Sequence, residues 1–412
     1  MRREYRCALV GAVWLASLGV TFTASAQGPR VRDSAGVRIV ENVRGSWGDT
    51  RRIVVEPIPS LVLGGPGARE EKFLDVKPTA ARLGNGDVAV VDQARFRISW
   101  FDSTGKLLRH TGARGPGETA GQFNYMGRII PVGKDAVALY DGALARYTEF
   151  DRKGVVRRWD HFNPAPYLPH PMGKGRAFRD LFGSLTDGRL IGYQFDNWRD
   201  GRQQLVTESL TVMAVSSSGK WTRIMPALRQ EYSIVNDGIG RPSAMDVRPF
   251  GRVGLFAVRG SDWLYADGQR YEVEVRSLDG ALRKIIRIRR SPIPVAGADI
   301  SRFTAVRLAR TDTIVRSVFA KAFRTLPYPA NRPAFAGLIV DAAGLIWAKN
   351  WAFDGEPALW EVFDPDGVLL GQVEVPADLD VLEIGRDYLL ARVDKLNSEN
   401  EVRIYRLKRA PP

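Results

Sequence analysis

The stretch Leu83-Gly-Asn-Gly-Asp-Val-Ala-Val-Val-Asp92 is followed by Arg97-Ile-Ser-Trp-Phe-Asp-Ser-Thr-Gly105, and the chain repeats this pattern 49 residues later. The second copy reads Val132-Gly-Lys-Asp-Ala-Val-Ala-Leu-Tyr-Asp141 and Phe150-Asp-Arg-Lys-Gly154. A Gly-Pro-Gly triplet and a phenylalanine precede each copy at a spacing of 50, as Gly65–Gly67 with Phe73 and Gly115–Gly117 with Phe123. Agreement at three separate places indicates an internal repeat, which decides the fold before any other feature does.

Each copy has the composition of short β-strands joined by tight turns. The apolar runs are rich in valine, isoleucine and aromatic residues, and several alternate with polar residues, which is typical of strands. Further runs of this kind are Ala136–Tyr140, Tyr271–Arg276, Leu359–Phe363 and Val402–Leu407. Asp-x-x-Gly and Asp-Gly sequences suit the turns, because glycine adopts positive φ without steric cost. A unit of roughly 40–50 residues with four strands predicts a β-propeller blade.

The number of blades follows from counting these units. Five internal units begin near Phe73, Phe123, Phe178, Phe250 and Phe335. The ends of the chain supply a sixth, because three strand-like runs between residues 380 and 407 lack a fourth. Ser60–Leu63 precedes the triplet Gly65–Gly67, just as the predicted outer strand at Leu107-Leu108 precedes the triplet Gly115–Gly117. We therefore expect an N-terminal strand to be the outer strand of the last blade, which hides an open edge. Seven blades is the alternative count.

The sequence thus predicts an all-β fold, a six-bladed β-propeller with four-stranded blades over residues 58–408. Residues 27–57 form an N-terminal extension. One helical insertion is expected at about 297–325, where Ile314, Val318 and Ala322 recur at helical spacing and Thr311 or Asp312 can cap the helix. A shorter helix starting at Asp299 is expected to precede it.

The repeat resembles a known family. The Gly-x-x-Gly…Phe pattern, the Gly-Asp run to Asp92 and the Arg97–Gly105 segment look like the NHL-type repeat of six-bladed, TolB-like β-propellers. The segment Asp33–Val40 also looks like exported bacterial proteins of this kind. The resemblance is good over residues 61–154, fair over 335–407 and poor between them. It implies a fold and leaves the activity open, because the family includes binding scaffolds and some enzymes.

Residues 1–26 have the organisation of a secretory signal peptide. A basic start precedes the apolar run Cys7–Phe22, and Ala24-Ser-Ala26 provides a cleavage site. We therefore expect an exported protein, periplasmic or extracellular, with no membrane span after cleavage; a membrane anchor is the alternative. Cys7 is the only cysteine, so disulfides and thiolate chemistry are excluded from the mature chain.

The net charge of the chain is +14, which attracts anions. The positive residues are scattered rather than clustered, and export argues against nucleic acid as a partner. The sequence contains no HExxH, P-loop or Gly-x-Ser-x-Gly motif, so it gives no sign of a zincin, a nucleotide-binding loop or an α/β-hydrolase serine.

The insertions are expected on one face. If the strands of a blade are lettered A to D from the axis outward, the B–C and D–A connections share one face and the A–B and C–D turns share the other. The long segments all fall in B–C or D–A connections, at 161–176, 195–204, 230–249, 292–333 and around 350–357. Because function on a rigid scaffold sits preferentially in such loops, this face is the predicted binding surface.

Arginines and aromatic residues on that face are the candidate ligand-binding residues. Arg95, Arg146 and Arg270 follow the ends of B strands and could bind an anionic ligand bidentately, or neutralise neighbouring aspartates. Trp198, Trp351 and Phe353 lie in loops and could stack on a sugar or a peptide, or pack at the rim of the core.

Aspartates at the same strand ends are the candidate metal ligands. Asp92, Asp141 and Asp394 end B strands, as does Asp267, and a ring of carboxylates near the axis could hold calcium. In the alternative each aspartate bonds the backbone N–H groups of its own turn. No motif requires a cofactor, and calcium is the one metal that these residues suggest.

Two functions remain open. The favoured one is an exported, non-catalytic and monomeric propeller that binds a protein, peptide or glycan through its long-loop face. The other is a calcium-dependent, lactonase-like hydrolase or lyase with its site at the propeller axis.

Overall fold

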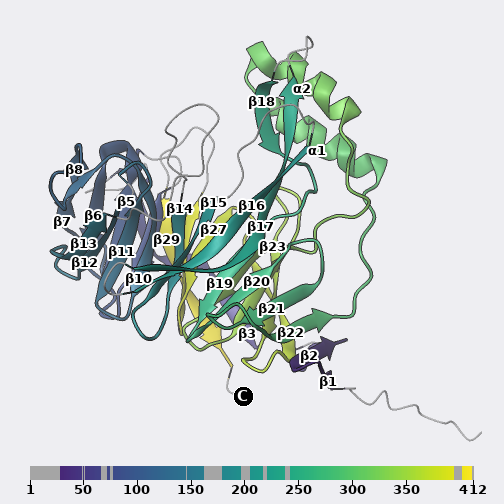
Figure 1. Ribbon diagram of the computed structural model, residues 1–412, viewed down its shortest axis with the longest axis horizontal. Coiled ribbons are helices and arrows are strands. Elements are labelled where there is room, and N and C mark those ends of the chain that lie inside the picture. The colour runs from purple at the N-terminus through teal and green to yellow at the C-terminus, as the bar shows by residue number, and fades with distance from the viewer. Residues whose placement is uncertain are drawn as a thin grey trace, which may run out of the picture.

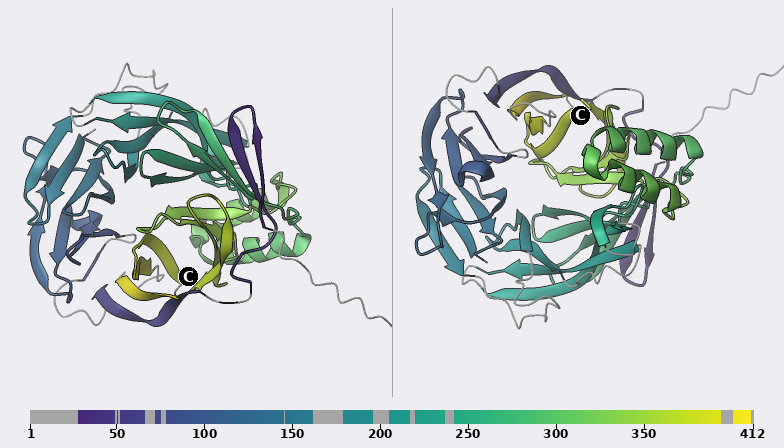
Figure 2. Two further views of the ribbon diagram at one scale, coloured as in Figure 1. Left: turned by 90° about the horizontal axis from the view of Figure 1, so that it is seen from below. Right: turned by 90° about the horizontal axis from the view of Figure 1, so that it is seen from above.

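The computed structural model describes residues 28–48, 50, 52–65, 72–74, 78–144, 146–161, 179–195, 205–216, 220–236, 242–393 and 401–410. Six β-sheets stand around a common axis as the blades of a propeller, which confirms the predicted fold (Figures 1 and 2). The predicted signal peptide and the candidate residues Trp198 and Asp394 lie outside the described residues.

Blades 1 and 2 are the two copies of the sequence repeat. Blade 1 consists of β4 (Thr79–Arg82), β5 (Val88–Asp92), β6 (Arg97–Phe101) and β7 (Leu107–Thr111). Blade 2 consists of β10 (Met126–Val132), β11 (Ala136–Asp141), β12 (Arg146–Asp151) and β13 (Val156–His161). The connections hold a short 3-10 helix, Gln93–Arg95, and a small parallel pair, β8 (Ala113–Arg114) with β9 (Gln122–Phe123). The repeat is kept in register, because Asp92 pairs with Arg97 as Asp141 pairs with Arg146.

Blades 3 and 4 have the same four-stranded core and carry additions at the outer edge. Blade 3 consists of β14 (Arg179–Ser184), β15 (Leu190–Phe195), β16 (Leu205–Val215), β17 (Trp221–Asn236) and β18 (Pro242–Val247). Blade 4 consists of β19 (Leu255–Arg259), β20 (Asp262–Ala266), β21 (Glu272–Arg276), β22 (Leu282–Ile288), β2 (Val37–Asn42) and β1 (Arg30–Ser34). The strand β2 runs parallel to β22 and covers its free edge.

Blades 5 and 6 complete the ring. Blade 5 consists of β23 (Phe335–Val340), β24 (Ile346–Asn350), β25 (Ala358–Phe363) and β26 (Leu369–Val375). Blade 6 consists of β27 (Leu379–Ile384), β28 (Tyr388–Val393), β29 (Glu401–Arg409) and β3 (Ile53–Gly64). Val402 pairs with Leu63 and Ile404 with Leu61, so the outer strand of the last blade comes from the N-terminal region, as predicted.

The segment between β2 and β3 crosses the outer edge of blade 5. Ser46 N donates to Leu369 O at 3.0 Å and Trp47 N to Leu370 O at 2.7 Å. The Trp47 ring lies against Gly371, where a Cβ would stand 2.5 Å from the ring. The N-terminal region therefore touches the outer edges of blades 4, 5 and 6 in turn.

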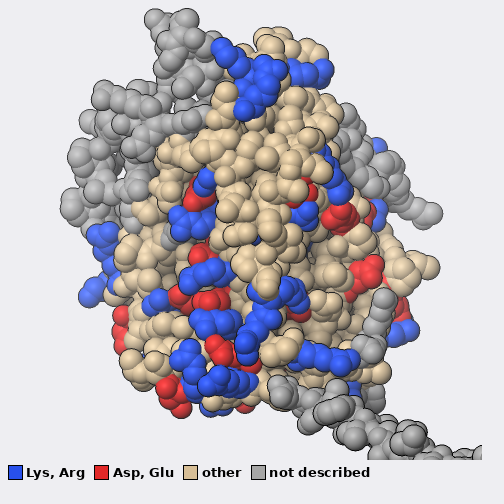
Figure 3. All heavy atoms as spheres, turned by 90° about the vertical axis from the view of Figure 1, so that its right-hand side faces the viewer, with Lys and Arg blue, Asp and Glu red and all other residues tan. Residues whose placement is uncertain are grey.

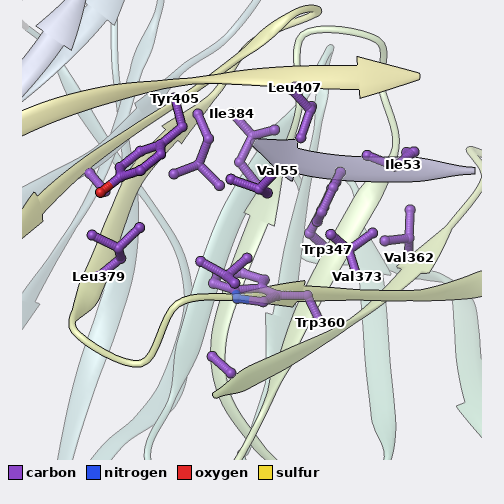
Figure 4. Packing of buried hydrophobic residues seen from close by; sticks show 14 of the residues in the cluster. Ile53, Val55, Trp347, Trp360, Val362, Val373, Leu379, Ile384, Tyr405 and Leu407 are labelled. Atoms are coloured by element: carbon purple, nitrogen blue, oxygen red, sulfur yellow. The ribbon is translucent and has the colours of Figure 1, made fainter. Parts of the chain in front are cut away.

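The core consists of apolar layers between neighbouring blades. Figure 4 shows the layer between blades 5 and 6, where Trp347, Trp360 and Val362 of blade 5 pack against Ile384 of blade 6. The other labelled members are Ile53, Val55, Val373, Leu379, Tyr405 and Leu407. Because β3 supplies two of these side chains, the closing strand is part of the core and not only of the sheet.

A ring of hydrogen bonds ties neighbouring blades together at the face of the short A–B and C–D turns. At least one bond between described residues spans each of the six junctions between blades. The bonds are Gly84 N to Lys134 O (2.7 Å), Ser184 Oγ to Pro131 O (2.8 Å), Thr186 N to Gly260 O (3.1 Å), Arg259 Nη1 to Pro365 O (2.7 Å), Ala342 N to Ile384 O (3.1 Å) and Arg82 N to Glu383 Oε2 (3.1 Å). At the junction of the last blade with the first, the side chain of Glu383 completes the ring.

Two helices, α1 (Gly297–Ala309) and α2 (Thr313–Thr325), stand at the opposite end of the molecule from the C-terminus (Figure 1). Asp312 caps α2, as expected, by accepting from Ile314 N at 2.8 Å. The first helix is longer than expected, because Asp299 accepts from Ala296 N and anchors a first turn that no proline interrupts. No helix in the described parts of the chain is both long enough and apolar enough to span a membrane.

Candidate functional site

The candidate aspartate Asp92 lies where the sequence placed it, at the end of a B strand, and it is fully buried. Arg95 Nη1 donates to its Oδ2 at 2.7 Å, so this pair neutralises itself. Asp92 Oδ1 is buried and has no hydrogen-bond partner among the described residues. Asp92 therefore keeps one unused acceptor, while Arg95 is committed to the aspartate and to the carbonyl of Lys72.

Asp141 and Arg146 fix a loop rather than face a ligand. Asp141 accepts from the backbone N–H groups of Asn124 (2.7 Å), Tyr125 (3.1 Å), Ala143 (2.9 Å) and Leu144 (2.9 Å). Arg146 is completely buried and donates to the carbonyls of Gly117, Thr119, Ala120 and Gln122. Burial lowers the pKa of the Arg146 guanidinium, and the nearby Asp141 carboxylate opposes that shift. Both side chains are thus occupied in holding residues 117–125 and the turn after β11 that contains Ala143 and Leu144.

Arg270 is the one candidate arginine whose side chain is mostly exposed, at 57%. It forms ion pairs with Asp267 at 3.1 Å and with Glu272 at 3.4 Å. Asp267 also accepts from Gln269 N at 3.0 Å, so this aspartate bonds its own turn. The described residues contain no group of three or more His, Cys, Asp or Glu side chains arranged to hold a metal ion. Calcium binding therefore stays a prediction.

Trp351 and Phe353 come together in an aromatic cluster beneath the helices. Their ring centroids are 4.8 Å apart, and Phe250 lies 5.4 Å from Trp351 and 6.3 Å from Phe353. Phe303 of α1 joins the cluster at 5.7 Å from Phe250. The guanidinium of Arg302 lies over the Phe353 ring at 4.2 Å. These contacts bind the helices to the B–C loop of blade 5.

Ion pairs brace the same assembly. Three of them join the helices to the connections below: Arg302 with Glu356 (2.5 Å), Arg310 with Asp354 (2.6 Å) and Arg332 with Asp299 (2.6 Å). Arg248 donates to Pro327 O at 2.6 Å and to Glu231 of β17 at 2.9 Å. We call α1, α2 and residues 351–356 the helical platform, since these contacts hold them as one unit.

The solvent side of the platform carries basic and apolar side chains. Ile314, Ser317, Lys321 and Arg324 follow one another at helical spacing along the exposed side of α2, and Ile314 is 85% exposed. Phe319 and Phe323 are buried on the opposite side of the helix. Figure 3 shows Lys and Arg side chains at the top of the molecule with no Asp or Glu beside them, and more Lys and Arg interspersed with Asp and Glu over its lower half. The platform is therefore a positively charged surface with apolar side chains within it.

A second site, formed by residues that the sequence did not indicate, lies on the propeller axis towards the short-turn face. All six innermost strands line a cavity of about 180 Å³ there. Its apolar walls include Ala80, Ile130, Phe182, Phe256, Leu338 and Leu382. Arg128 and Glu383 are the charged residues among those that line it.

β-Bulges direct several of these side chains to the axis. The register of the A strand shifts between Met126 and Ile129 in blade 2, between Leu181 and Gly183 in blade 3, and between Val381 and Glu383 in blade 6. The extra residues, Arg128, Phe182 and Leu382, all line the cavity. Because a bulge turns a side chain away from regular alternation, the period of the sequence did not reveal them.

Glu383 also joins the first and last blades. Its Oε2 accepts from Arg82 N at 3.1 Å, and its Oε1 accepts from the Tyr388 hydroxyl. The Arg82 guanidinium stacks on the Tyr388 ring at 4.2 Å. Burial raises the pKa of the Glu383 carboxyl, against the opposing effect of the hydrogen bonds from Tyr388 and Arg82. Burial and the adjacent carboxylate also raise the pKa of Tyr388.

Comparison with known proteins shows a likeness of overall arrangement. No family model matches the chain, and no curated protein matches its sequence. Similar solved structures include a Bacteroides fragilis protein assigned as exported, with 11% identity, a TM-score of 0.47 and coverage of 90% of this chain and 100% of that one. A Bacteroides vulgatus member of the DUF4221 family has 12% identity, a TM-score of 0.48 and coverage of 87% and 100%. Virginiamycin B lyase from Staphylococcus aureus has 9% identity, a TM-score of 0.40 and coverage of 86% and 99%. At these values the likeness supports no argument about activity.

Proposed function

We propose that this protein is an exported, non-catalytic binding propeller that carries a protein, peptide or glycan partner on its long-loop face. The observation that carries this proposal is the helical platform. Ion pairs and aromatic contacts hold the platform together, and Arg248 joins the end of the helical segment to Glu231 of blade 3, so the platform presents a preformed surface. A preformed surface lowers the entropy cost of binding.

The charge of the platform favours an acidic partner. Lys321 and Arg324 lie exposed on α2 beside Ile314, and no described carboxylate forms an ion pair with either of them. Complementary charge steers association and suppresses wrong partners, while exposed apolar side chains add contact area. Trp351 and Phe353 pack against Phe250 and the Arg302 guanidinium within the platform, so recognition rests on charge rather than on these rings.

Two further parts of the proposal come from the sequence. Export rests on the signal-like residues 1–26, and the relation to NHL-repeat, TolB-like propellers rests on the resemblance over residues 61–154. Amino-terminal sequencing of the protein recovered outside the cytoplasm tests export. A start at Gln27 supports it, and an intact Met1 contradicts cleavage.

The binding test uses charge reversal on two faces. Lys321→Glu with Arg324→Glu reverses the platform, and Lys106→Glu with Lys153→Glu makes the same change on exposed C–D turns of the opposite face. The probes are polyglutamate and alginate, measured by fluorescence anisotropy at low and physiological salt. We expect the platform variant to bind either probe about fivefold or more weakly, given roughly 0.2–1 kcal/mol per exposed charge pair. Equal loss in both variants would show non-specific attraction and contradict the proposal.

The alternative function, a calcium-dependent lactonase-like hydrolase or lyase, has one observation in its favour, the unused Oδ1 of buried Asp92. Both carboxylate oxygens of Asp141 accept hydrogen bonds from backbone N–H groups, and Asp394 lies outside the described residues. No catalytic step through calcium therefore follows from this geometry. Elemental analysis after dialysis without chelator tests the alternative. One calcium per chain that disappears in Asp92→Asn would favour the enzyme, and lactones and esters would then be screened as substrates.

A further inference from the structure

The axial cavity has an aromatic wall on the side of blades 3 and 4. The rings of Phe182 and Phe256 are 5.2 Å apart, and both side chains line the cavity. Tyr193 lies 6.2 Å from Phe182 and Tyr265 lies 5.4 Å from Phe256, so other rings support the wall from behind. An aromatic surface that is held in this way offers a preformed contact for an apolar body.

The side formed by blades 2 and 6 carries a cation. Arg128 is exposed to the cavity and donates from Nη2 to Leu382 O at 3.3 Å. Its guanidinium forms no ion pair with a carboxylate among the described residues, because the nearby Glu383 is already bonded to Tyr388 and to Arg82 N. A guanidinium has five N–H donors in a planar fork, which matches a carboxylate bidentately.

We propose that the axial cavity is a binding site for a small organic anion, a monocarboxylate with an apolar or aromatic body. The carboxylate pairs with Arg128, and the body lies on the wall of Phe182 and Phe256. The size of the cavity limits the ligand, because about 180 Å³ is close to the roughly 150 Å³ that accommodates a benzene molecule in a protein core.

Binding of such an anion is coupled to a proton through Glu383. The charged and titratable groups that face this carboxyl are Arg82 of β4, Arg128 of β10 and Tyr388 of β28. Burial already raises the pKa of Glu383, and a second anion beside it raises that pKa further. A bound anion therefore favours the protonated form of the Glu383 carboxyl, and the affinity falls as the pH rises through the raised pKa of Glu383.

Calorimetric titration of the purified protein with benzoate tests the site. Benzyl alcohol keeps the ring without the charge, and inorganic phosphate supplies charge without a ring. We expect benzoate to bind at least tenfold more tightly than either probe, with proton uptake that shows as a dependence of the heat on the ionisation enthalpy of the buffer. The absence of benzoate binding at millimolar concentration would overturn the proposal.

Variants assign the binding to Arg128. Arg128→Gln is expected to weaken benzoate binding at least tenfold, Arg128→Lys to retain part of the affinity, and Phe256→Leu to weaken it a few-fold. Arg289→Gln, an exposed arginine after β22, is the control and leaves the affinity unchanged. Equal affinity in Arg128→Gln and the wild type would contradict the site, provided that the melting temperatures agree. The platform variants keep benzoate binding, so failure here is distinguishable from failure of the proposed function.

Discussion

The two faces of the propeller are built in different ways. On the short-turn face, brief connections repeat around the ring and a hydrogen bond spans every junction between blades. On the long-loop face, the connections differ from blade to blade, and the largest, the helical platform, is held by ion pairs and packed aromatic rings. The contrast indicates that hydrogen bonds at the short-turn face join every pair of neighbouring blades, which leaves the long-loop face free to carry a binding surface.

The largest effect on stability is expected at the closing strand, β3, which belongs to the ring and not to the binding surface. Leu63 is 2% exposed, between the first and last blades, whereas its neighbour Val62 is 46% exposed. Leu63→Asp buries an unpaired charge and should cost more than about 3 kcal/mol in the free energy of unfolding. Val62→Asp is the control and should change it by less than about 0.5 kcal/mol. Urea unfolding measures both, and similar values would show that closure does not stabilise the ring.

The next largest effect concerns the arginines that the sequence offered as ligand-binding residues. Arg146→Met removes the donor from four backbone carbonyls and should destabilise the protein by about 2–4 kcal/mol. Arg270→Met, at an exposed position, should change stability by less than about 0.5 kcal/mol. Thermal unfolding distinguishes the two. If Arg146→Met melts like the wild type, the structural role given to Arg146 is wrong.

A smaller effect is expected where the platform joins blade 3. Burial acts to raise the pKa of Glu231, but hydrogen bonds from Arg252 and Arg248 lower it overall. Glu231→Gln should therefore cost about 1–2 kcal/mol at neutral pH and speed proteolytic cleavage around the helices. A carboxyl with a lowered pKa stabilises the fold above its ordinary value of 4.5, and that contribution disappears as the pH falls through the lowered value. The difference in the free energy of unfolding between wild type and variant should therefore disappear at acid pH. A difference that does not change with pH would contradict an ionic origin of the Glu231 contribution.

The smallest effect is expected at the junction of the first and last blades. The pKa of Glu383 is raised in the folded protein, so its contribution to stability is complete below the ordinary value of 4.5 and is lost as the pH rises through the raised value. Glu383→Gln cannot titrate. Melting temperatures between pH 4 and 8 should fall more steeply with rising pH in the wild type than in the variant. If the two curves of melting temperature against pH are parallel, the titration of Glu383 does not affect the stability of this junction.

Sequence periodicity predicted the ring but not its additions. Valine-rich strands with alternating apolar and polar residues, and Asp-x-x-Gly turns, recur because every blade packs against its neighbours in the same way. Blades 1 and 2 could therefore be aligned residue by residue. The pairing of β2 with β22 had no such signal, since a strand that joins an outer edge in parallel depends on a neighbour 245 residues away in the pair Asn42 and Arg287. Long-range pairing of this kind leaves no local pattern.

The candidate site was predicted less well than the fold, for a related reason. Arg146 and Phe353 were chosen as loop residues of suitable chemistry, but the structure uses both in internal contacts. Arg128 stands in the run Met-Gly-Arg-Ile-Ile, and Glu383 stands in Leu-Asp-Val-Leu-Glu-Ile. A charged residue inside an innermost strand was the available signal, but only the bulges bring such residues to the axis.

The closing strand also sets the order in which the molecule can fold. Gly64 pairs with Glu401, which is 337 residues further along the chain, and the other pairs of β3 are more distant still. Joining two ends over that length costs about 5 kcal/mol of chain entropy. The contacts within blade 6 offset this cost only after β3 has paired with β29. Contacts of such high sequence separation make folding slow, since local blades can form early while the ring must wait for its last strand. Formation of the sixth blade is therefore the slow step in the folding of this propeller. Until β3 has paired with β29, the edges of β29 and of blade 1 are exposed and can pair with the wrong partner.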